Sequence, residues 1–436
     1  MDATPSRLTA SLFCTNTFSK VSVISLHRHE SGRHRFLPIA LYVALPLASS
    51  AALPQTKSPT PQSFKQLSEQ AVEASEENRL SEAATLYRKA LALRPRWAEG
   101  WWSLGTLQYD QNQYMQAAAS FQKLIVLHPE NGTAHAMLGL CQVELNQDDL
   151  ALKNLSLSRS LGVQNDPRLQ HVVLFQTSRV QLRKRQFGDS LSTLALLIQD
   201  GVRSQEVVNA LGMAALRIEP RNAPADGTPG RDVVDRVGRA QMATILKDFG
   251  TAKQIFTLVS TEYPAYPELH FAFGRSLLDA HESDEGVAEF HKELEKNPKH
   301  VGALLEIAAV RYRVDSADGI NYAEQAVKIS PQLPFAHYLL GLLYLDTDRT
   351  AEAVPELEIA RKAFAKQAQV YFALGNAYAK LGRKADAARM RAEFVRLNAA
   401  EKAQKGGTNS DVYGDQSSGV LSQKLDQQTS QPTPKP

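Results

Sequence analysis

Cysteine is scarce in this sequence. Only Cys14 and Cys141 occur among the 436 residues, and two isolated thiols build neither a disulfide framework nor a metal site. Cys141 falls inside a helical pattern at a position suited to a small residue, which favours a buried packing role over a reactive one. A fold that is held together by disulfides is therefore excluded.

A surplus of charge is also missing. The chain has 49 basic and 46 acidic residues. Residues 1–52 hold five basic and two acidic residues, which leaves 44 of each sign for the rest of the chain. Because nucleic-acid binding needs a basic patch or stripe that neutralises phosphates, this balance argues against a nucleic-acid partner.

The usual catalytic motifs are absent as well. The sequence has no glycine-rich phosphate loop, no nucleophile elbow and no His-Glu-x-x-His. Asp346 and Asp348 stand close together, but the glycine and the closing glutamate of a calcium loop are missing. The hydrophobic fraction of 43% is nevertheless typical of a folded protein. We expect a folded, non-enzymatic protein without a cofactor or a bound metal.

Long hydrophobic runs are missing too, apart from one near the start. A mostly apolar run at residues 36–48 follows a basic stretch at 28–35 and precedes the small residues 49–52. This is the layout of a secretory signal peptide, and a membrane-spanning helix would need about 20 residues. We expect residues 1–52 to be an extension with a cleaved signal, followed by a linker at 53–63. The protein would then be periplasmic or extracellular; a membrane tether through an uncleaved signal is the alternative.

From residue 64 onward the sequence repeats with a period of about 34 residues. The copy at 98–131 shows the pattern most fully: Trp101, Leu104, Gly105, Asn112, Ala117, Phe121, Leu124 and Pro129. The same pattern returns in copies at 64–97, 132–165, 171–204, 233–266, 267–300, 301–333, 334–367 and 368–401. The copy at 301–333 is one residue short.

The repeated residues have physical roles in a helical hairpin. Small residues such as Gly105 and Ala117 let two antiparallel helices approach closely, while Phe121 fills the space between hairpins. Asn112 and Gly382 suit a tight turn with positive φ. Pro129 ends the second helix. Since one hairpin cannot bury its apolar face alone, several copies must stack.

The pattern resembles the tetratricopeptide repeat family. The resemblance implies an all-α fold, a right-handed superhelical solenoid of about nine antiparallel helix hairpins. We expect four repeats at 64–204 and five at 233–401. Between them, residues 205–232 read as a first helix without its second, followed by a Pro/Gly-rich insertion. The polar residues 402–436 are expected to form a disordered tail.

The resemblance also implies a binding surface. In this family the first helix of each hairpin forms the concave side, and the second, fifth, ninth, twelfth and thirteenth residues of each copy face inward. We name these the inward positions. They carry aromatic and basic side chains, which protein interfaces use as anchors: Trp102, Tyr109, Phe175, Arg179, Arg183, Phe271, Arg275, Tyr312, Arg313, Phe335, Tyr338, Phe372, Asn376 and Lys380.

We therefore hypothesise a groove for a protein or peptide partner. The alternative is that some of these residues only stabilise the superhelix. The family's carboxylate clamp is not expected, because only Asn376 and Lys380 fit it, in a single copy. His135, His270 and His337 share one repeat position with Trp101 and Tyr371, which favours packing over metal binding.

Three functions stay open at this point. The first is an exported scaffold or adaptor in envelope assembly, secretion or polysaccharide export. The second is an accessory subunit that presents substrate to a separate enzyme, such as a glycosyltransferase or a peptidase. The third is a structural solenoid that self-associates through its ends, although Lys384, Arg389, Arg391, Glu393 and Arg396 give the last helix the look of a solvating cap.

Overall fold

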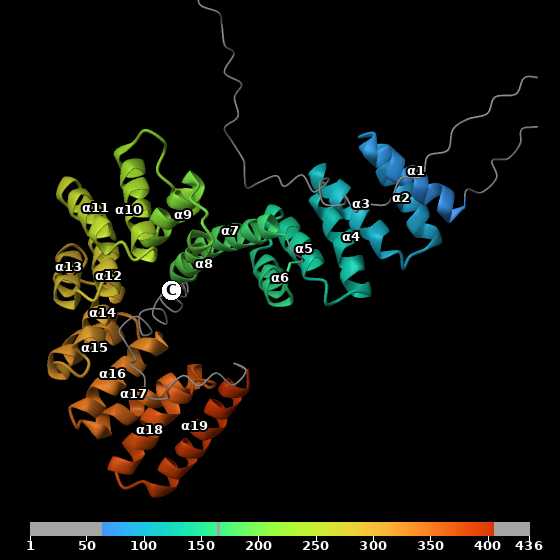
Figure 1. The fold of residues 1–436 in the computed structure, drawn as a ribbon. Coiled ribbons are helices and arrows are strands. Elements are labelled where there is room, and N and C mark those ends of the chain that lie inside the picture. Colours follow the sequence, from blue (N-terminus) through green and yellow to red (C-terminus); the bar gives the residue numbers. More distant parts are fainter. Residues whose placement is uncertain (1–62, 164–165, 405–436) are drawn as a thin grey trace, which may run out of the picture. The chain divides into compact units, whose positions relative to one another are not determined.

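The computed structural model describes residues 63–163 and 166–404. Within these ranges the chain forms the helices α1 to α19 and one short 3-10 helix, and it contains no strand (Figure 1). The all-α array of helix hairpins that the repeats predict is confirmed. The predicted signal at 1–52, nearly all of the linker and all but the start of the tail lie outside the described residues.

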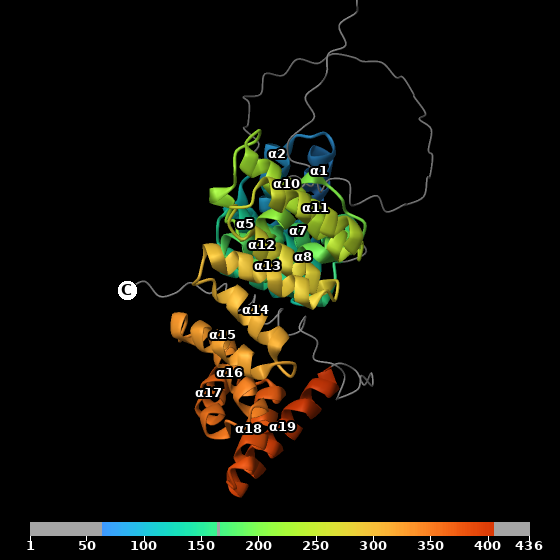
Figure 2. The same ribbon diagram turned by 90° about the vertical axis from the view of Figure 1, so that its left-hand side faces the viewer.

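The chain divides into two compact units, and the boundary falls inside α7, between Val173 and Leu174. The first unit contains α1 (Phe64–Glu76), α2 (Leu80–Leu93), α3 (Ala98–Asp110), α4 (Tyr114–Leu127), α5 (Gly132–Glu144), α6 (Asp148–Leu161) and the start of α7 (Pro167–Arg183). The second unit continues with α8 (Phe187–Gln199), α9 (Gln205–Ala215), the 3-10 helix η2 (Pro220–Asn222), α10 (Pro229–Ile245), α11 (Phe249–Glu262), α12 (Leu269–Asp279), α13 (Ser283–Lys296), α14 (Val301–Arg311), α15 (Ser316–Ile329), α16 (Pro334–Asp346), α17 (Thr350–Ala363), α18 (Ala368–Lys380) and α19 (Lys384–Gln404). Figures 1 and 2 show the hairpins from α12–α13 to α18–α19 following one another along this unit.

A glycine in the first helix sets the spacing of several hairpins. A Cβ on Gly105 would lie 2.8 Å from the Phe121 ring, and one on Gly274 would lie 2.5 Å from the Phe290 ring. Gly341 faces Leu357 at 2.6 Å in the same way. The large side chain of the second helix therefore packs directly on the backbone of the first, which is the close approach expected from the repeated small residue.

The tight turns within the hairpins have a left-handed residue. Asn112 and Gly382 have φ values of 58° and 72°, as predicted. Arg185 and Lys247 hold the same conformation at 60° and 61°, although it is costly for a side chain without a local hydrogen-bonding group. The turn geometry is thus kept by the packing of the two helices even where the residue does not favour it.

The helix α9 is packed more tightly than its sequence suggested. A Cβ on Gly212 would lie 1.9 Å from the Val234 carbonyl oxygen, and one on Gly238 of α10 would lie 2.0 Å from the Val208 carbonyl oxygen. The backbones of α9 and α10 are therefore in direct contact, and α10 packs against α11 as well. Instead of a first helix without a second, α9 has α10 as its partner, and α10 begins at Pro229 after the N-cap Thr228.

Candidate partner-binding surface

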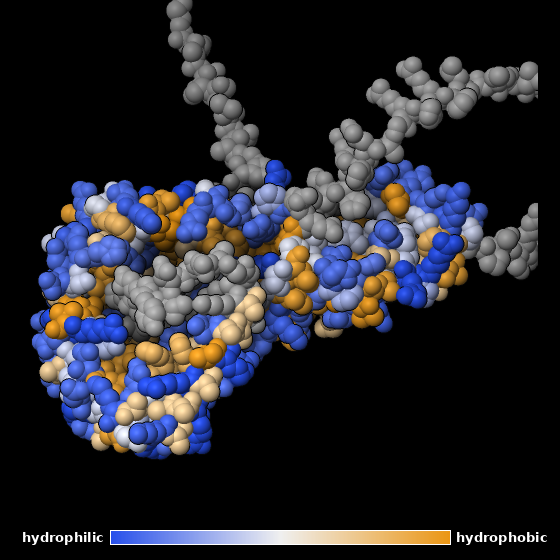
Figure 3. All heavy atoms as spheres, turned by 60° about the horizontal axis from the view of Figure 1, so that its bottom comes forward, coloured by the Kyte–Doolittle hydropathy of each residue, from blue (hydrophilic) through white to orange (hydrophobic). Residues whose placement is uncertain are grey.

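The inward positions differ widely in accessibility. Arg179, Arg313, Phe372 and Lys380 are exposed. Intermediate exposure is found for Trp102, Arg183, Arg275, Tyr312 and Asn376. The predicted surface is therefore only partly accessible to a partner. In the space-filling view, apolar residues border the hollow of the second unit (Figure 3).

Five aromatic residues of the predicted groove lie in the core instead. Tyr109, Phe175, Phe271, Phe335 and Tyr338 are all buried, so the expectation that they anchor a partner is corrected. The reason for Phe335 and Tyr338 is that neighbouring first helices pack on one another. Leu305 and Ala309 of α14 share one apolar cluster with Tyr338 and Leu342 of α16. Inward-facing residues there fill the space between the helices.

Phe271 is buried for another reason. The His300 ring lies 4.7 Å from its ring centroid, and the Arg217 guanidinium lies 5.8 Å from it. Arg217 follows α9 and is also 3.9 Å from the Glu268 carboxylate. Arg217, just after α9, therefore covers this part of α12, which the repeat pattern alone could not reveal.

Tyr312 and Arg313 lie beyond the end of their helix. Because the copy at 301–333 is one residue short, α14 ends at Arg311 and Arg313 takes the left-handed turn position with φ 66°. Its guanidinium lies 5.1 Å from the Tyr312 ring, and a hydrogen bond with Tyr312 raises the pKa of Arg313. The prediction that Arg313 faces the groove is corrected, since it belongs to a turn.

Two basic inward residues brace neighbouring hairpins. The Lys380 ammonium lies 2.7 Å from the Asp348 carboxylate, and this contact lowers the pKa of Asp348. Arg275 of α12 lies 3.6 Å from the carboxylate of Glu306, which is buried in α14. Both cations support the array itself, which is the structural alternative left open for these residues.

The shared histidine position carries a repeated polar contact. In five repeats the side chain at this position lies within 3.3 Å of the carbonyl oxygen six residues earlier: Trp101 with Pro95, His135 with Pro129, His270 with Pro264, His337 with Pro331, and Tyr371 with Ala365. The side chain thus ties the start of each first helix to the preceding loop. A packing role for the histidines follows from this geometry.

The histidines also have a partner that the sequence analysis missed. Their Nδ1 atoms lie 2.5–2.9 Å from an oxygen of Asn154, Glu289 or Glu356, always 19 residues later. The repeats with Trp101 and Tyr371 have Ser120 and Met390 there instead. The constant spacing of 19 residues between a histidine and an acid or amide was the signal that could have identified these pairs.

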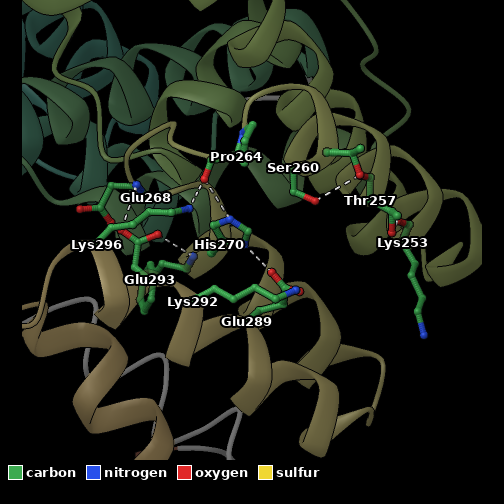
Figure 4. Close-up of polar contacts among 12 residues, drawn as sticks. Lys253, Thr257, Ser260, Pro264, Glu268, His270, Glu289, Lys292, Glu293 and Lys296 are labelled. Carbon is green, nitrogen blue, oxygen red and sulfur yellow. Dashed lines mark hydrogen bonds and ion pairs between the residues drawn. The ribbon is translucent and has the colours of Figure 1, made fainter.

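Figure 4 shows this arrangement around His270, which lies between the Pro264 carbonyl and the Glu289 carboxylate. Burial tends to raise the pKa of Glu289, but hydrogen bonds from His270 and Lys292 outweigh it and hold the pKa below its ordinary value. Nearby, the buried Glu293 carboxylate accepts hydrogen bonds from the backbone N–H groups of Glu268 and Phe271, each at 3.3 Å. These charges stabilise the start of α12.

The His337 pair predicts a pH dependence. The hydrogen bond with Glu356 raises the pKa of His337 against the effect of burial, and the Pro331 carbonyl adds to it. The stabilisation is therefore complete below the unfolded pKa of about 6.5 and is lost as pH rises through the higher folded pKa. From pH 6 to 8 the parent should lose about 1.5 kcal/mol that the variant His337→Tyr/Glu356→Met does not lose.

This variant copies the pair Tyr371 and Met390, which the last repeat already uses. Urea unfolding at pH 6, 7 and 8 measures the difference between parent and variant. Parallel stability profiles for the two proteins would contradict the proposed role of the ionised pair.

The described residues contain no group of three His, Cys, Asp or Glu side chains that could hold a metal ion. None of the helices in the described ranges is both long and apolar enough to cross a membrane.

A model of the tetratricopeptide repeat matches residues 103–155 and 338–390. No functionally curated protein matches the sequence. Among solved structures, MamA from Desulfovibrio magneticus RS-1 is 20% identical with a TM-score of 0.35, over 39% of this chain and 98% of that chain. A tetratricopeptide repeat protein from Parabacteroides merdae is 13% identical with a TM-score of 0.31, over 72% and 98%. A chain of the APC/C hetero-tetramer Cut9–Hcn1 is 12% identical with a TM-score of 0.33, over 77% of this chain and 87% of that chain.

TM-scores this low do not establish a relationship, so the family assignment depends on the repeats in the sequence. The matched stretches cover hairpins of both compact units. The period of about 34 residues, the glycine-spaced hairpins and the left-handed turns agree with them. The chain therefore carries tetratricopeptide repeats in both compact units.

Proposed function

We propose that the protein is an exported scaffold that binds protein or peptide partners through the inward positions that stay accessible. Tetratricopeptide repeats are protein-interaction modules, although a fold alone does not fix a partner. The observation that carries the proposal is the exposure of large side chains at inward positions: Trp102 on α3 and Arg179 on α7. An aromatic ring or a guanidinium that remains accessible on a rigid helix is a typical interface anchor.

The two compact units offer different contacts, an aromatic ring on the first and a guanidinium on the second. Trp102 is partly exposed, although its ring packs at 5.7 Å from the Phe121 ring. Arg179 is exposed and donates a hydrogen bond to Gln176 at 3.0 Å, which holds its guanidinium in place. On the first unit an apolar side chain would bind on the indole of Trp102, and on the second unit a carboxylate would bind near the guanidinium of Arg179.

The proposed setting is the bacterial envelope or the extracellular space, in assembly, secretion or polysaccharide export. It is supported by the signal-like order of residues 28–52. A mature N-terminus near Leu53 in protein purified from the envelope of the native host is expected. A mature N-terminus at Met1 would argue against export.

Site-specific photo-crosslinking in the native host tests the binding surface. Trp102 or Arg179 is replaced by a photoreactive phenylalanine. The matched controls place the same residue at Val126 of α4 and Leu258 of α11, which are exposed on second helices of the same two units. Discrete partners are expected from positions 102 and 179, at least fivefold above the controls.

Equal crosslinking from all four positions, with circular dichroism showing that each variant is folded, would place binding away from the inward surface. Crosslinks only from Val126 and Leu258 would assign it to the second helices.

A further inference from the structure

The last hairpin leaves an apolar patch uncovered. In the earlier hairpins of the second unit, from α10–α11 onward, the second helix packs against the first helix of the next hairpin. No described helix follows α19. On this side Phe372 is 47% exposed and Val395 is 63% exposed. Phe394 is partly exposed, and its ring centroid lies 5.4 Å from that of Phe372.

Basic groups border this patch. The stem of Arg391 lies 3.4 Å from where a Cβ on Gly375 would be, in the place that Phe121 or Leu357 occupies in other hairpins. Arg391 is exposed and forms no ion pair with another described residue. We define Phe372, Arg391, Phe394 and Val395 as the terminal patch. It combines two rings and a branched aliphatic group with a cation, so it suits an apolar segment that carries carboxylates.

A segment of the same chain has this chemistry. Residues 405–436 continue directly from α19, and Asp411-Val-Tyr-Gly-Asp415 places a branched and an aromatic residue between two carboxylates. Helix geometry puts the end of α19 about 15 Å beyond Phe394. The nine residues 405–413 span up to about 30 Å when extended, so Tyr413 can return to the patch.

We propose that the terminal patch binds residues 411–415 of the same chain. Val412 and Tyr413 cover the exposed Phe372, Phe394 and Val395, and the flanking carboxylates lie near Arg391. The short tether gives the segment an effective concentration of the order of millimolar, so the contact forms even if each side-chain interaction is weak. The contact does not depend on the proposed function, because it needs no partner.

Disulfide trapping in the full chain tests this contact. Cysteines replace Val395 and Tyr413, and in a matched control they replace Val395 and Thr429. Cys14 is changed to serine; Cys141 can remain, because it is buried and burial raises the pKa of its thiol to about 12. Loop-closure statistics alone favour the shorter pair by about threefold.

We expect the pair 395–413 to close in dilute protein with oxidised glutathione at least tenfold faster than 395–429. Adding Phe372→Ser should bring the ratio back to about threefold, because this exposed residue can change while helix content stays intact. A parent ratio near three, or disulfides that form mainly between two chains, would overturn the proposal.

Discussion

Replacing Gly212 by valine is expected to lower the stability of the second unit by about 3 kcal/mol or more, since overpacking costs about 1–3 kcal/mol even when neighbours can adjust. Here the nearest atom is the Val234 carbonyl oxygen, 1.9 Å from the new Cβ. A backbone atom cannot turn away as a side chain can. The helices α9 and α10 would have to separate, which also disturbs the packing of α10 on α11.

The measurement is urea unfolding followed by far-UV circular dichroism. All three tryptophans, Trp97, Trp101 and Trp102, lie in the first unit, so tryptophan fluorescence gives an internal reference that should move less. The control is Gly250→Ala on α11, where a Cβ meets nothing within 4 Å. It should leave stability unchanged or raise it by up to about 1 kcal/mol. Equal losses in both variants would contradict the close contact at Gly212.

Truncating Phe290 to alanine should cost about 3–5 kcal/mol, the usual range for a buried phenylalanine. Its ring is fully buried, lies against Gly274 and is 5.8 Å from the Phe271 ring. Removing it leaves a cavity between α12 and α13, because the backbone of Gly274 offers no side chain to fill the space.

The matched control is Phe372→Ala, which removes the same atoms from a ring that is about half exposed. We expect this variant to lose less than about 1 kcal/mol, since surface substitutions usually change stability little. Both are measured by urea unfolding at pH 7. If Phe372→Ala cost as much as Phe290→Ala, the burial that distinguishes the two rings would be contradicted.

The parts of the fold that could be predicted from sequence are those that depend on neighbours within one hairpin. Gly105 and Phe121 belong to one hairpin, and so do Asn112 and its turn. Their spacing is therefore fixed by helix geometry and is visible as a period of about 34 residues. The histidine position could be identified for the same reason, since His135, His270 and His337 occupy equivalent places.

The accessibility of the inward positions could not be predicted in this way, because it depends on how neighbouring hairpins pack. Tyr338 has an inward-facing repeat position, but it packs in one cluster with Leu305 and Ala309 of the preceding first helix. Phe271 is covered by residues far away in the sequence. Arg313 shows a third cause: one missing residue ends α14 early and moves the side chain from a helix to a turn.

The helix α10 packs most extensively against two helices of its unit, α9 and α11. To α9 it stands as the closing helix of a pair, and to α11 it stands as the opening helix of the next. The alternation of first and second helices along the chain therefore shifts by one helix, which is half a repeat, at α10. Recombination that duplicates or removes a whole repeat keeps the alternation of helices on either side. An exchange that carries α9 without α10 would leave Gly212 without the Val234 carbonyl that it packs against.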